Sequence, residues 1–224
     1  MIEKRPIIVG VDYSKNSPAA VKLIMNENFE IVEHRFIGFS TTKKGVTDNI
    51  HHLIKKSFLD DIAQYLWVND ILQDFILDDD VGVDYVAFEG YAFGAKHRGF
   101  EIAEATGDMK RRVYEQGAWM RIYDPMSIKM FATGSGSAKK PDMAAAFEKV
   151  DSSERPQLSE VNEDIIDAYW VTKLLQIELK LRSGQVHTKN LPEHQVRVFN
   201  RVTKTNPENI LVRPFIEKEH KVIL

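Results

Sequence analysis

The sequence of 224 residues contains no cysteine. Disulfide bonds and thiolate-ligated zinc sites are therefore excluded. No apolar run approaches the roughly 20 residues that a membrane-spanning helix needs. Residues 1–5 lack the apolar core and cleavage site of a secretory signal peptide. These absences predict an intracellular, cytoplasmic protein with no membrane partner.

Internal repeats and low-complexity segments are also absent. The composition, with 43% hydrophobic and 28% charged residues, is ordinary for a globular protein. The length fits one large domain, or one domain with an appendage, and is ample for a hydrophobic core.

The net charge of -3 does not by itself indicate a nucleic-acid partner. Between Gly90 and Lys140, however, nine basic residues face five acidic ones, a local charge of +4 that leaves -7 for the remainder. This basic middle, which includes the cluster Lys110-Arg111-Arg112, is either a surface for a polyanion or a solvated helix face. Charge alone favours the second interpretation.

Five short runs rich in β-branched and aromatic residues predict strands. They are residues 7–12, 19–25, 30–39, 85–89 and 119–123. The first, IIVGVD, is apolar without alternation, which is typical of a strand buried on both faces. The turn composition of Asn26-Glu27-Asn28 favours an antiparallel meander for the first three strands.

Helical periodicity and helix-start signals predict four helices. They cover residues 48–77, 98–115, 141–150, and a final helix from an Asn162 cap to Leu181. We expect the second to be interrupted near Gly107 and residues 151–160 to form a loop. His51 and His52 fall in the first helix, where neighbouring side chains point about 100° apart and cannot chelate one metal, so we interpret them as structural.

The order of these elements predicts an α/β protein with a mixed five-stranded sheet flanked by helices. Three of the elements carry carboxylates at their ends. Asp12 ends the first strand, Glu89 ends the fourth, and Asp164 and Asp167 share one face at the start of the last helix. Each acid has an ordinary explanation, because carboxylates solvate strand ends and stabilise helix starts.

Four carboxylates that meet at one sheet edge repel one another unless cations lie between them. Oxygen ligands without cysteine or histidine favour Mg²⁺ or Mn²⁺. Two such ions, ~3.5–4 Å apart, suit phosphodiester hydrolysis. The pattern therefore indicates a metal-dependent phosphodiesterase if the four acids converge.

The segments VGVDYS, FEGYAFGAK, IKMFATGSGSAKK and EDIIDAYWV, in this order, resemble the RuvC family of Holliday junction resolvases, in a divergent, phage-type form. The resemblance covers residues 7–181 and is most specific at the GxGxAxK and DxxDA elements. It implies an RNase H-like nuclease domain over residues 1–182 and a homodimer that nicks branched DNA with divalent metal. Residues 183–224 remain as a C-terminal extension of unknown role.

The resemblance assigns two Mg²⁺ ions per site, with Mn²⁺ as a substitute, to Asp12, Glu89, Asp164 and Asp167. It matches Lys129 and Lys140 to lysines that contact DNA and support catalysis, since a lysine can neutralise a phosphate. Without the motif, Lys139 and Lys140 would be interpreted as a solvated loop tip. We expect all three lysines to contact DNA.

Two positions depart from the family pattern. Ser14 replaces the glycine of the usual DxG, and Ala92 replaces a phenylalanine three residues after the glutamate. Tyr91 and Phe93 flank Ala92, so either aromatic ring is a candidate to stack on DNA bases.

The leading hypothesis is an endodeoxyribonuclease that resolves four-way junctions, forks or flaps during recombination and repair, in a host cytoplasm if the protein is phage-encoded. The alternative is a catalytically silent RNase H-fold protein that binds branched nucleic acid. An ATP-using member of the wider fold group is disfavoured, because no phosphate-binding glycine loop follows the first strand.

Overall fold

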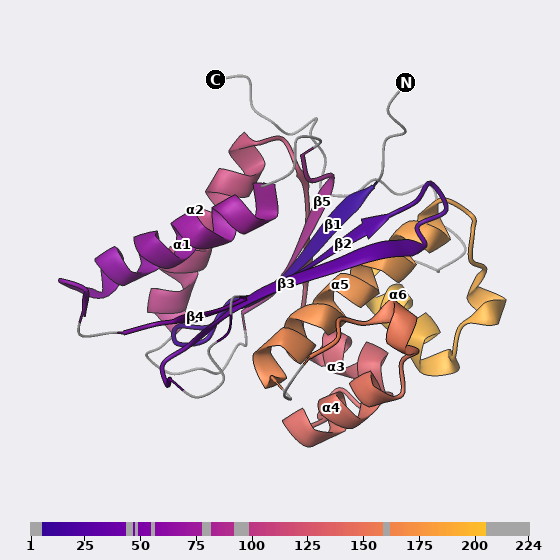
Figure 1. The fold of residues 1–224 in the computed structure, drawn as a ribbon. Coiled ribbons are helices and arrows are strands. Elements are labelled where there is room, and N and C mark those ends of the chain that lie inside the picture. The colour runs from indigo at the N-terminus through magenta and orange to yellow at the C-terminus, as the bar shows by residue number, and fades with distance from the viewer. Residues whose placement is uncertain are drawn as a thin grey trace.

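The computed structural model describes residues 6–43, 47, 49–54, 57–77, 82–91, 99–158 and 162–204, except the side chains of residues 99 and 100. A six-stranded mixed sheet lies between two layers of helices (Figure 1). The strands are β1 (Ile7–Asp12), β2 (Ala19–Met25), β3 (Ile31–Ser40), β4 (Ile50–His52), β5 (Tyr85–Glu89) and β6 (Trp119–Tyr123). The helices are α1 (Asp61–Leu77), α2 (Gly99–Glu115), α3 (Pro125–Thr133), α4 (Lys140–Glu148), α5 (Glu163–Arg182) and α6 (Glu193–Thr203). The predicted α/β class and the five predicted strands are confirmed, with β4 as an additional strand.

The strand order is β4-β3-β2-β1-β5-β6, which places β1 inside the sheet. β1 pairs antiparallel with β2 and parallel with β5, and β2 continues antiparallel to β3. Ile8 and Val9 are both fully buried although they point to opposite faces. The continuous apolar run of β1 therefore serves two hydrophobic cores.

One core lies between the sheet and helices α1 and α2, and it contains Val9 and Val11. The other lies between the sheet and the layer that holds α3, α4, α5 and α6, and it contains Ile8. Figure 1 shows these two layers on opposite sides of the sheet. α5 packs against both β1 and β2.

The prediction of one helix over residues 48–77 is wrong in its first part. Residues Ile50–His52 pair in parallel with Gly38–Ser40 of β3, and α1 begins only at Asp61. Asp60 accepts a hydrogen bond from the Ala63 amide at 2.8 Å and fixes this start. The apolar spacing matched a helix because Ile50 and Leu53 are both buried, but the free sheet edge beside β3 determines their conformation.

His51 and His52 therefore lie in β4 and not in a helix. The ring centroid of His51 is 5.4 Å from that of Phe39 and 6.4 Å from that of Trp67. These aromatic contacts give His51 a packing role, and its pKa is lowered by burial.

Three other boundaries differ from the predictions. α2 runs through Gly107 without interruption, α4 begins at Lys140, one residue before the predicted start, and residues Ser152–Glu154 of the predicted loop form a short 3-10 helix. α3 was not predicted, because Asp124-Pro125 was interpreted only as the end of a strand. Asp124 is in fact the N-cap of α3, and proline is well tolerated in a first turn.

Part of the C-terminal extension forms α6, which packs on α3. Val198 and Phe199 of α6 are buried in the same core as α5. Within the described residues, no helix combines the length and apolar character needed to cross a membrane.

Candidate active site

A pocket of about 340 Å³ gathers acids from three elements that are distant in sequence. Its lining includes the four predicted carboxylates and the three predicted lysines: Asp12, Glu89, Asp164, Asp167, Lys129, Lys139 and Lys140. The pocket lies where β1 and β5 end and α5 begins. The structure thus brings these side chains together, while their catalytic roles stay predictions.

Asp12 and Glu89 are neighbours because β1 and β5 run parallel and in register. Val11 pairs with Phe88, and the next residue in each strand is the carboxylate, Asp12 in β1 and Glu89 in β5. Side chains at matched positions of adjacent strands point to the same face. Val11 and Phe88 face α1 and α2, and the two acids therefore face α5.

A close approach of β1 to α5 brings the acids of the helix to the same place. A Cβ atom on Gly10 would lie 2.2 Å from Thr172 Oγ1 and 2.8 Å from the Ala168 carbonyl oxygen. Asp12 lies two residues beyond Gly10, a step of about 6.6 Å along the strand. Asp164 lies one turn before Ala168, a step of about 6 Å along the helix. Because the two steps match, Asp12 faces the first turns of α5.

Asn162 fixes the start of α5. Its side-chain oxygen accepts a hydrogen bond from the Ile165 amide at 3.0 Å, which confirms the predicted cap. Asp164 and Asp167 follow at the positive end of the helix dipole, so their ordinary role as helix-start acids also holds. That role does not explain why the acids of β1 and β5 share the same pocket.

Burial raises the pKa of three of the four carboxyls. Burial, followed by the charge of Glu89, raises the pKa of Asp12 well above its usual range. The pKa of Glu89 is raised by burial, against a hydrogen bond from Asp12 and attraction by Lys129 and Lys140. The pKa of Asp167 is raised by burial to about 6, although attraction by Lys140 opposes the change. Ionising these carboxyls in the pocket therefore costs free energy, and a cation bound beside them would reduce that cost.

Lys140 already offsets part of this charge. Its Nζ donates to Asp164 Oδ1 at 3.2 Å and lies 3.3 Å from Glu163 Oε2. Burial acts to lower the pKa of Lys140, but attraction to Asp164 outweighs it and the pKa is raised. Lys129 enters the pocket from α3, and Lys139 from the residue that precedes α4.

The donors fit a hard divalent cation in their chemistry, since carboxylate oxygens are the ligands that Mg²⁺ and Mn²⁺ prefer. In the described part of the chain, no three His, Asp or Glu side chains already form a cluster that could hold a metal ion. The fit therefore rests on the shared pocket and on the excess negative charge within it.

Of the two predicted aromatic residues, Tyr91 is described and is not in the pocket lining. Tyr91 contacts α2, where Lys110 Nζ lies 4.5 Å from its ring centroid and 3.3 Å from its hydroxyl oxygen. Phe93 lies outside the described residues, as does Ala92.

The arginines of the Lys110-Arg111-Arg112 cluster pair with their own chain. Arg111 lies 2.7 Å from Glu115 and 3.0 Å from Asp108. Arg112 lies 2.7 Å from Asp108 and 2.6 Å from Asp70 of α1. The cluster therefore joins α1 to α2, which opposes the interpretation that these arginines line a DNA surface.

Arg121 of the basic middle also pairs internally. Its Nε donates to Glu178 Oε2 at 3.1 Å, and Tyr123 donates to the same oxygen at 2.6 Å. Arg182 donates to the other oxygen of this fully buried carboxylate at 2.7 Å. Among the described basic residues of this segment, the lysines at the pocket are the better candidates for phosphate contacts.

Sequence reasoning missed four residues that shape the site. Ser14, noted only as a departure from the family pattern, lines the pocket, as do Ile128 and Met143. Gly10 was not recognised as the contact that seats α5, although a glycine inside a buried strand is a signal of close backbone approach.

Searches with protein-family models and among curated proteins found no match to this sequence. Among solved structures, Thermus thermophilus RuvC in complex with a Holliday junction substrate is similar, with a TM-score of 0.52 and 14% identity over 80% of this chain and 96% of that chain. A second structure of Thermus thermophilus RuvC has a TM-score of 0.48 and 15% identity, again over 80% of this chain and 96% of that chain. At this identity the likeness shows the fold alone. The chain has the RNase H-like α/β fold of RuvC.

Proposed function

We propose that this protein is a metal-dependent endonuclease that nicks four-way junctions or other branched DNA in cytoplasmic recombination and repair. The observation that carries the proposal is the pocket, where carboxylates from β1, β5 and α5 meet three lysines. The fold supports it, because the RuvC protein that shares this fold was solved with a Holliday junction substrate.

The proposed cofactors are two Mg²⁺ ions, which Mn²⁺ can replace, held by Asp12, Glu89, Asp164 and Asp167. When bound, such ions lower the pKa of a water nucleophile and stabilise the leaving oxygen. The protein positions the four carboxylates on rigid strand and helix ends. These carboxylates must release their protons to bind cations, since the pKa values of three of them are raised.

The lysines would neutralise the phosphate that is cleaved or its neighbour. Lys140 is the proposed catalytic lysine, because its ammonium group already lies 3.2 Å from a pocket carboxylate. Lys129 and Lys139 would contact the DNA backbone nearby. Tyr91 and Phe93 are the proposed stacking residues.

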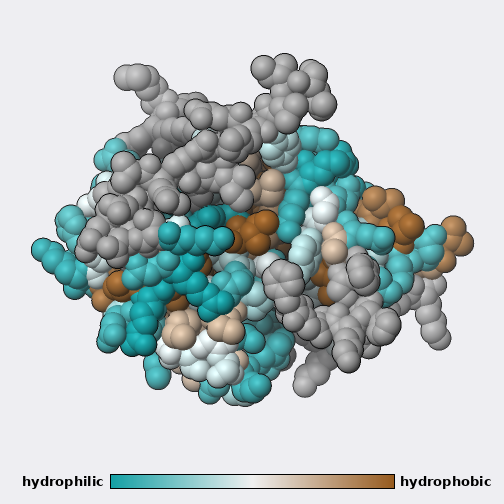
Figure 2. Space-filling model, turned by 180° about the vertical axis from the view of Figure 1, so that it is seen from behind, coloured by the Kyte–Doolittle hydropathy of each residue, from teal (hydrophilic) through white to brown (hydrophobic). Residues whose placement is uncertain are grey.

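A homodimer is part of the proposal, as symmetric four-way junctions fit two-fold symmetric proteins. An apolar stripe on and before α1 offers a surface, with Leu59 93%, Ile62 64% and Leu66 46% exposed. Figure 2 shows hydrophobic surface at its right-hand edge, on the side where α1 lies. Light scattering should give twice the monomer mass of 25.7 kDa, and Ile62→Glu should restore the monomer. A wild-type monomer at micromolar concentration would contradict this part of the proposal.

The central test is incubation with labelled four-way junctions, forks, flaps and linear duplexes in Mg²⁺ or Mn²⁺. We expect nicking of branched DNA and little nicking of the duplex. Asp167→Asn should lower cleavage by roughly two orders of magnitude or more, because one carboxylate that holds the ions has lost its charge. Junction binding should survive, since phosphate contacts come from lysines.

The test also decides the alternative. If the wild type binds branched DNA but cleaves none of it in either metal, the protein is a silent binder. If Asp167→Asn cleaves as fast as the wild type, Asp167 is only a helix-start acid.

A further inference from the structure

The C-terminal helix α6 packs along α3, the helix that carries Lys129 into the pocket (Figure 1). Phe199 of α6 is fully buried and meets Phe131 of α3 edge to face, with ring centroids 6.1 Å apart. The Gln195 side-chain amide donates to the Phe131 carbonyl oxygen at 3.4 Å. The middle of α3 is thus fixed to α6 by both apolar and polar contacts.

α6 also forms an ion pair with Asp124, the residue immediately before α3. Arg201 Nη2 lies 3.0 Å from Asp124 Oδ1. Asp124 is the N-cap of α3, and it accepts hydrogen bonds from the Ser127 amide at 3.0 Å and the Ser127 hydroxyl at 2.6 Å. Arg201 therefore holds the residue that fixes where α3 begins.

The end of α3 also lies close to α6. Gly134 ends the helix in the left-handed conformation, with φ of 83°. A Cβ atom there would lie 3.7 Å from the His194 ring, so the first turn of α6 lies against this cap. α6 therefore contacts the start, the middle and the end of α3.

Another face of α3 belongs to the pocket, where Pro125, Ile128 and Lys129 form part of the lining. α3 has only nine residues. Helices shorter than ~12–15 residues are marginal in isolation, so the position of α3 depends on its packing. Lys129 is consequently placed by contacts on the far side of its own helix.

We propose that α6 braces α3, and that Arg201 is a positioning residue which holds Lys129 at the carboxylate pocket. The catalytic part of this inference rests on the proposed function. α6 belongs to the extension for which the family resemblance offers no counterpart. It would give that extension a role in placing a cation at the site.

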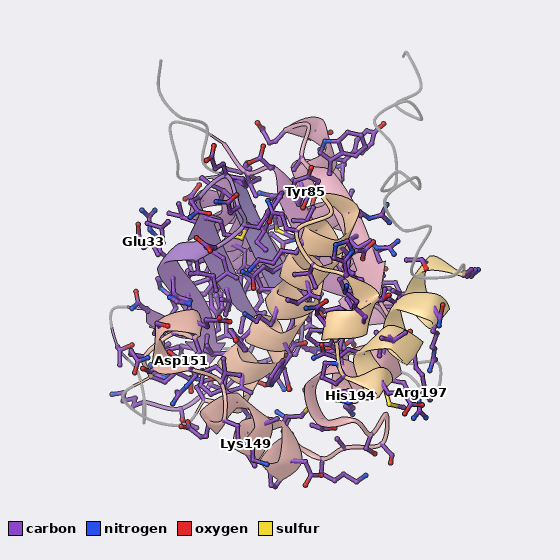
Figure 3. All side chains as sticks on the ribbon, turned by 90° about the vertical axis from the view of Figure 1, so that its right-hand side faces the viewer. Glu33, Tyr85, Lys149, Asp151, His194 and Arg197 are labelled. Atoms are coloured by element: carbon purple, nitrogen blue, oxygen red, sulfur yellow. The ribbon has the colours of Figure 1, made fainter. Side chains whose placement is uncertain are left out.

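Arg201→Gln is the informative variant, because the Arg201 side chain is 49% exposed and its removal leaves no core cavity. Arg197→Gln is the matched control on the same helix. Arg197 is 64% exposed and pairs at 2.9 Å with Glu193 of α6 itself, and Figure 3 shows it on the outside of the helix. Arg201→Lys keeps the positive charge and should rescue the defect in part.

Hydrogen exchange of the α3 amides is the readout that does not depend on cleavage. We expect Arg201→Gln to speed exchange over residues 127–131, while Arg197→Gln does not, and both should unfold within a few degrees of the wild type. Unchanged exchange in α3 would overturn the brace, whether or not the protein proves to be a nuclease.

Cleavage of a branched DNA then tests the link to Lys129. Arg201→Gln should lower kcat about tenfold with little change in KM, within the ~100-fold that a 1 Å displacement can cost. Combined with Lys129→Gln, it should add no further loss, because both changes remove the same cation from the site. Independent, multiplying losses would show that Arg201 acts elsewhere. No cleavage by the wild type would reject the proposed function and the catalytic part of the brace, while the exchange result would still decide the structural part.

Discussion

At the scale of single residues, the pocket gathers carboxyl groups from three elements, and burial raises the pKa of three of them. Burial, followed by the charge of Glu89, raises the pKa of Asp12, and burial raises the pKa of Glu89. Lys140 stands beside Asp164 and supplies one of the compensating charges. The protonation of these groups, and not only their position, therefore decides how readily a cation binds.

The pKa of about 6 for Asp167 predicts a pH-dependent effect of Asp167→Asn on the metal-free protein. An ordinary Asp has a pKa of about 3.9, so between these values the native state binds the proton more tightly than the unfolded state. The charge of Asp167 thus destabilises the fold increasingly as the pH rises from about 4 to about 6, and this destabilisation is constant at higher pH. We expect the thermal stability that Asp167→Asn gains over the wild type to grow between about pH 4 and pH 6 and to level off above pH 6.

The unfolding temperatures of Asp167→Asn and the wild type should be compared at each pH in the presence of a chelator. This comparison cancels the contribution of His34 and His51 to the pH dependence of stability, which has the opposite sign and is the same in both proteins. Burial lowers the pKa of both histidines, so their protonation destabilises the fold as the pH falls. A difference between variant and wild type that does not change between about pH 4 and pH 6 would show that the pKa of Asp167 is not raised.

At the scale of elements, the contact between β1 and α5 aligns the acids. Gly10 allows the helix backbone to approach the strand, and Thr172 donates to the Val21 carbonyl oxygen of β2 at 3.2 Å as well as to Ala168 within α5 at 2.8 Å. This contact makes the carboxylates of the strand ends and of the helix start parts of one rigid unit.

Gly10→Ala should therefore be severely destabilising, because the added Cβ atom would lie 2.2 Å from Thr172 Oγ1 and 2.5 Å from the Thr172 amide nitrogen. Overpacking commonly costs about 1–3 kcal/mol, and contact with backbone atoms places this site at or above the upper end. Urea unfolding measures the loss, and a cost below ~1 kcal/mol would show that α5 can shift without penalty.

Gly107→Ala is the matched control. Gly107 lies in α2, and among the described residues no atom outside its own helix turn lies within 4 Å of the position that a Cβ atom would take. Alanine in an open helix interior should raise the free energy of unfolding by about 1 kcal/mol. A loss of unfolding free energy in Gly10→Ala and a gain in Gly107→Ala would distinguish the effect of close backbone approach from that of helix propensity.

Strands with continuous apolar runs could be predicted from sequence, because a run of consecutive apolar residues indicates burial on both faces, as in Ile7–Asp12. β4 could not, since its three residues form a strand only through pairing with β3. α3 follows directly after β6, and its capping Asp124 carries the same sequence signal as a strand-ending turn.

The carboxylates of the candidate site could be predicted because strand ends and helix starts are positions that a sequence reveals. The resemblance then selected the lysines. Their surroundings could not be predicted, because Lys140 faces Asp164, and Arg112 faces Asp70 of α1, only after distant segments have packed.

At the scale of the whole molecule, an acidic protein presents a small group of lysines around one pocket. Arg112 and Arg121 of the same basic middle form ion pairs with α1 and α5. Recognition of DNA should therefore depend on a few phosphate contacts near the pocket.

Binding of a four-way junction should weaken with added salt, because each phosphate contact releases counterions. Lys140→Gln should reduce the slope of log affinity against log salt by about 1. Arg111→Gln is the control, because Arg111 pairs with Asp108 and Glu115 of its own helix and should leave the slope unchanged. Salt-independent binding would indicate a ligand other than nucleic acid.

The order of β1, β5 and α5 along the chain has a consequence for synthesis of the protein on the ribosome. Asp12 and Glu89 are adjacent in the sheet, but α5, which completes the pocket, is made last of the three elements. Chains emerge at roughly 5–20 residues per second, so for several seconds a nascent chain carries two of the acids without the other two. A nuclease with this layout has no complete site until α5 has emerged, and amino-terminal fragments from interrupted translation should leave cellular DNA intact.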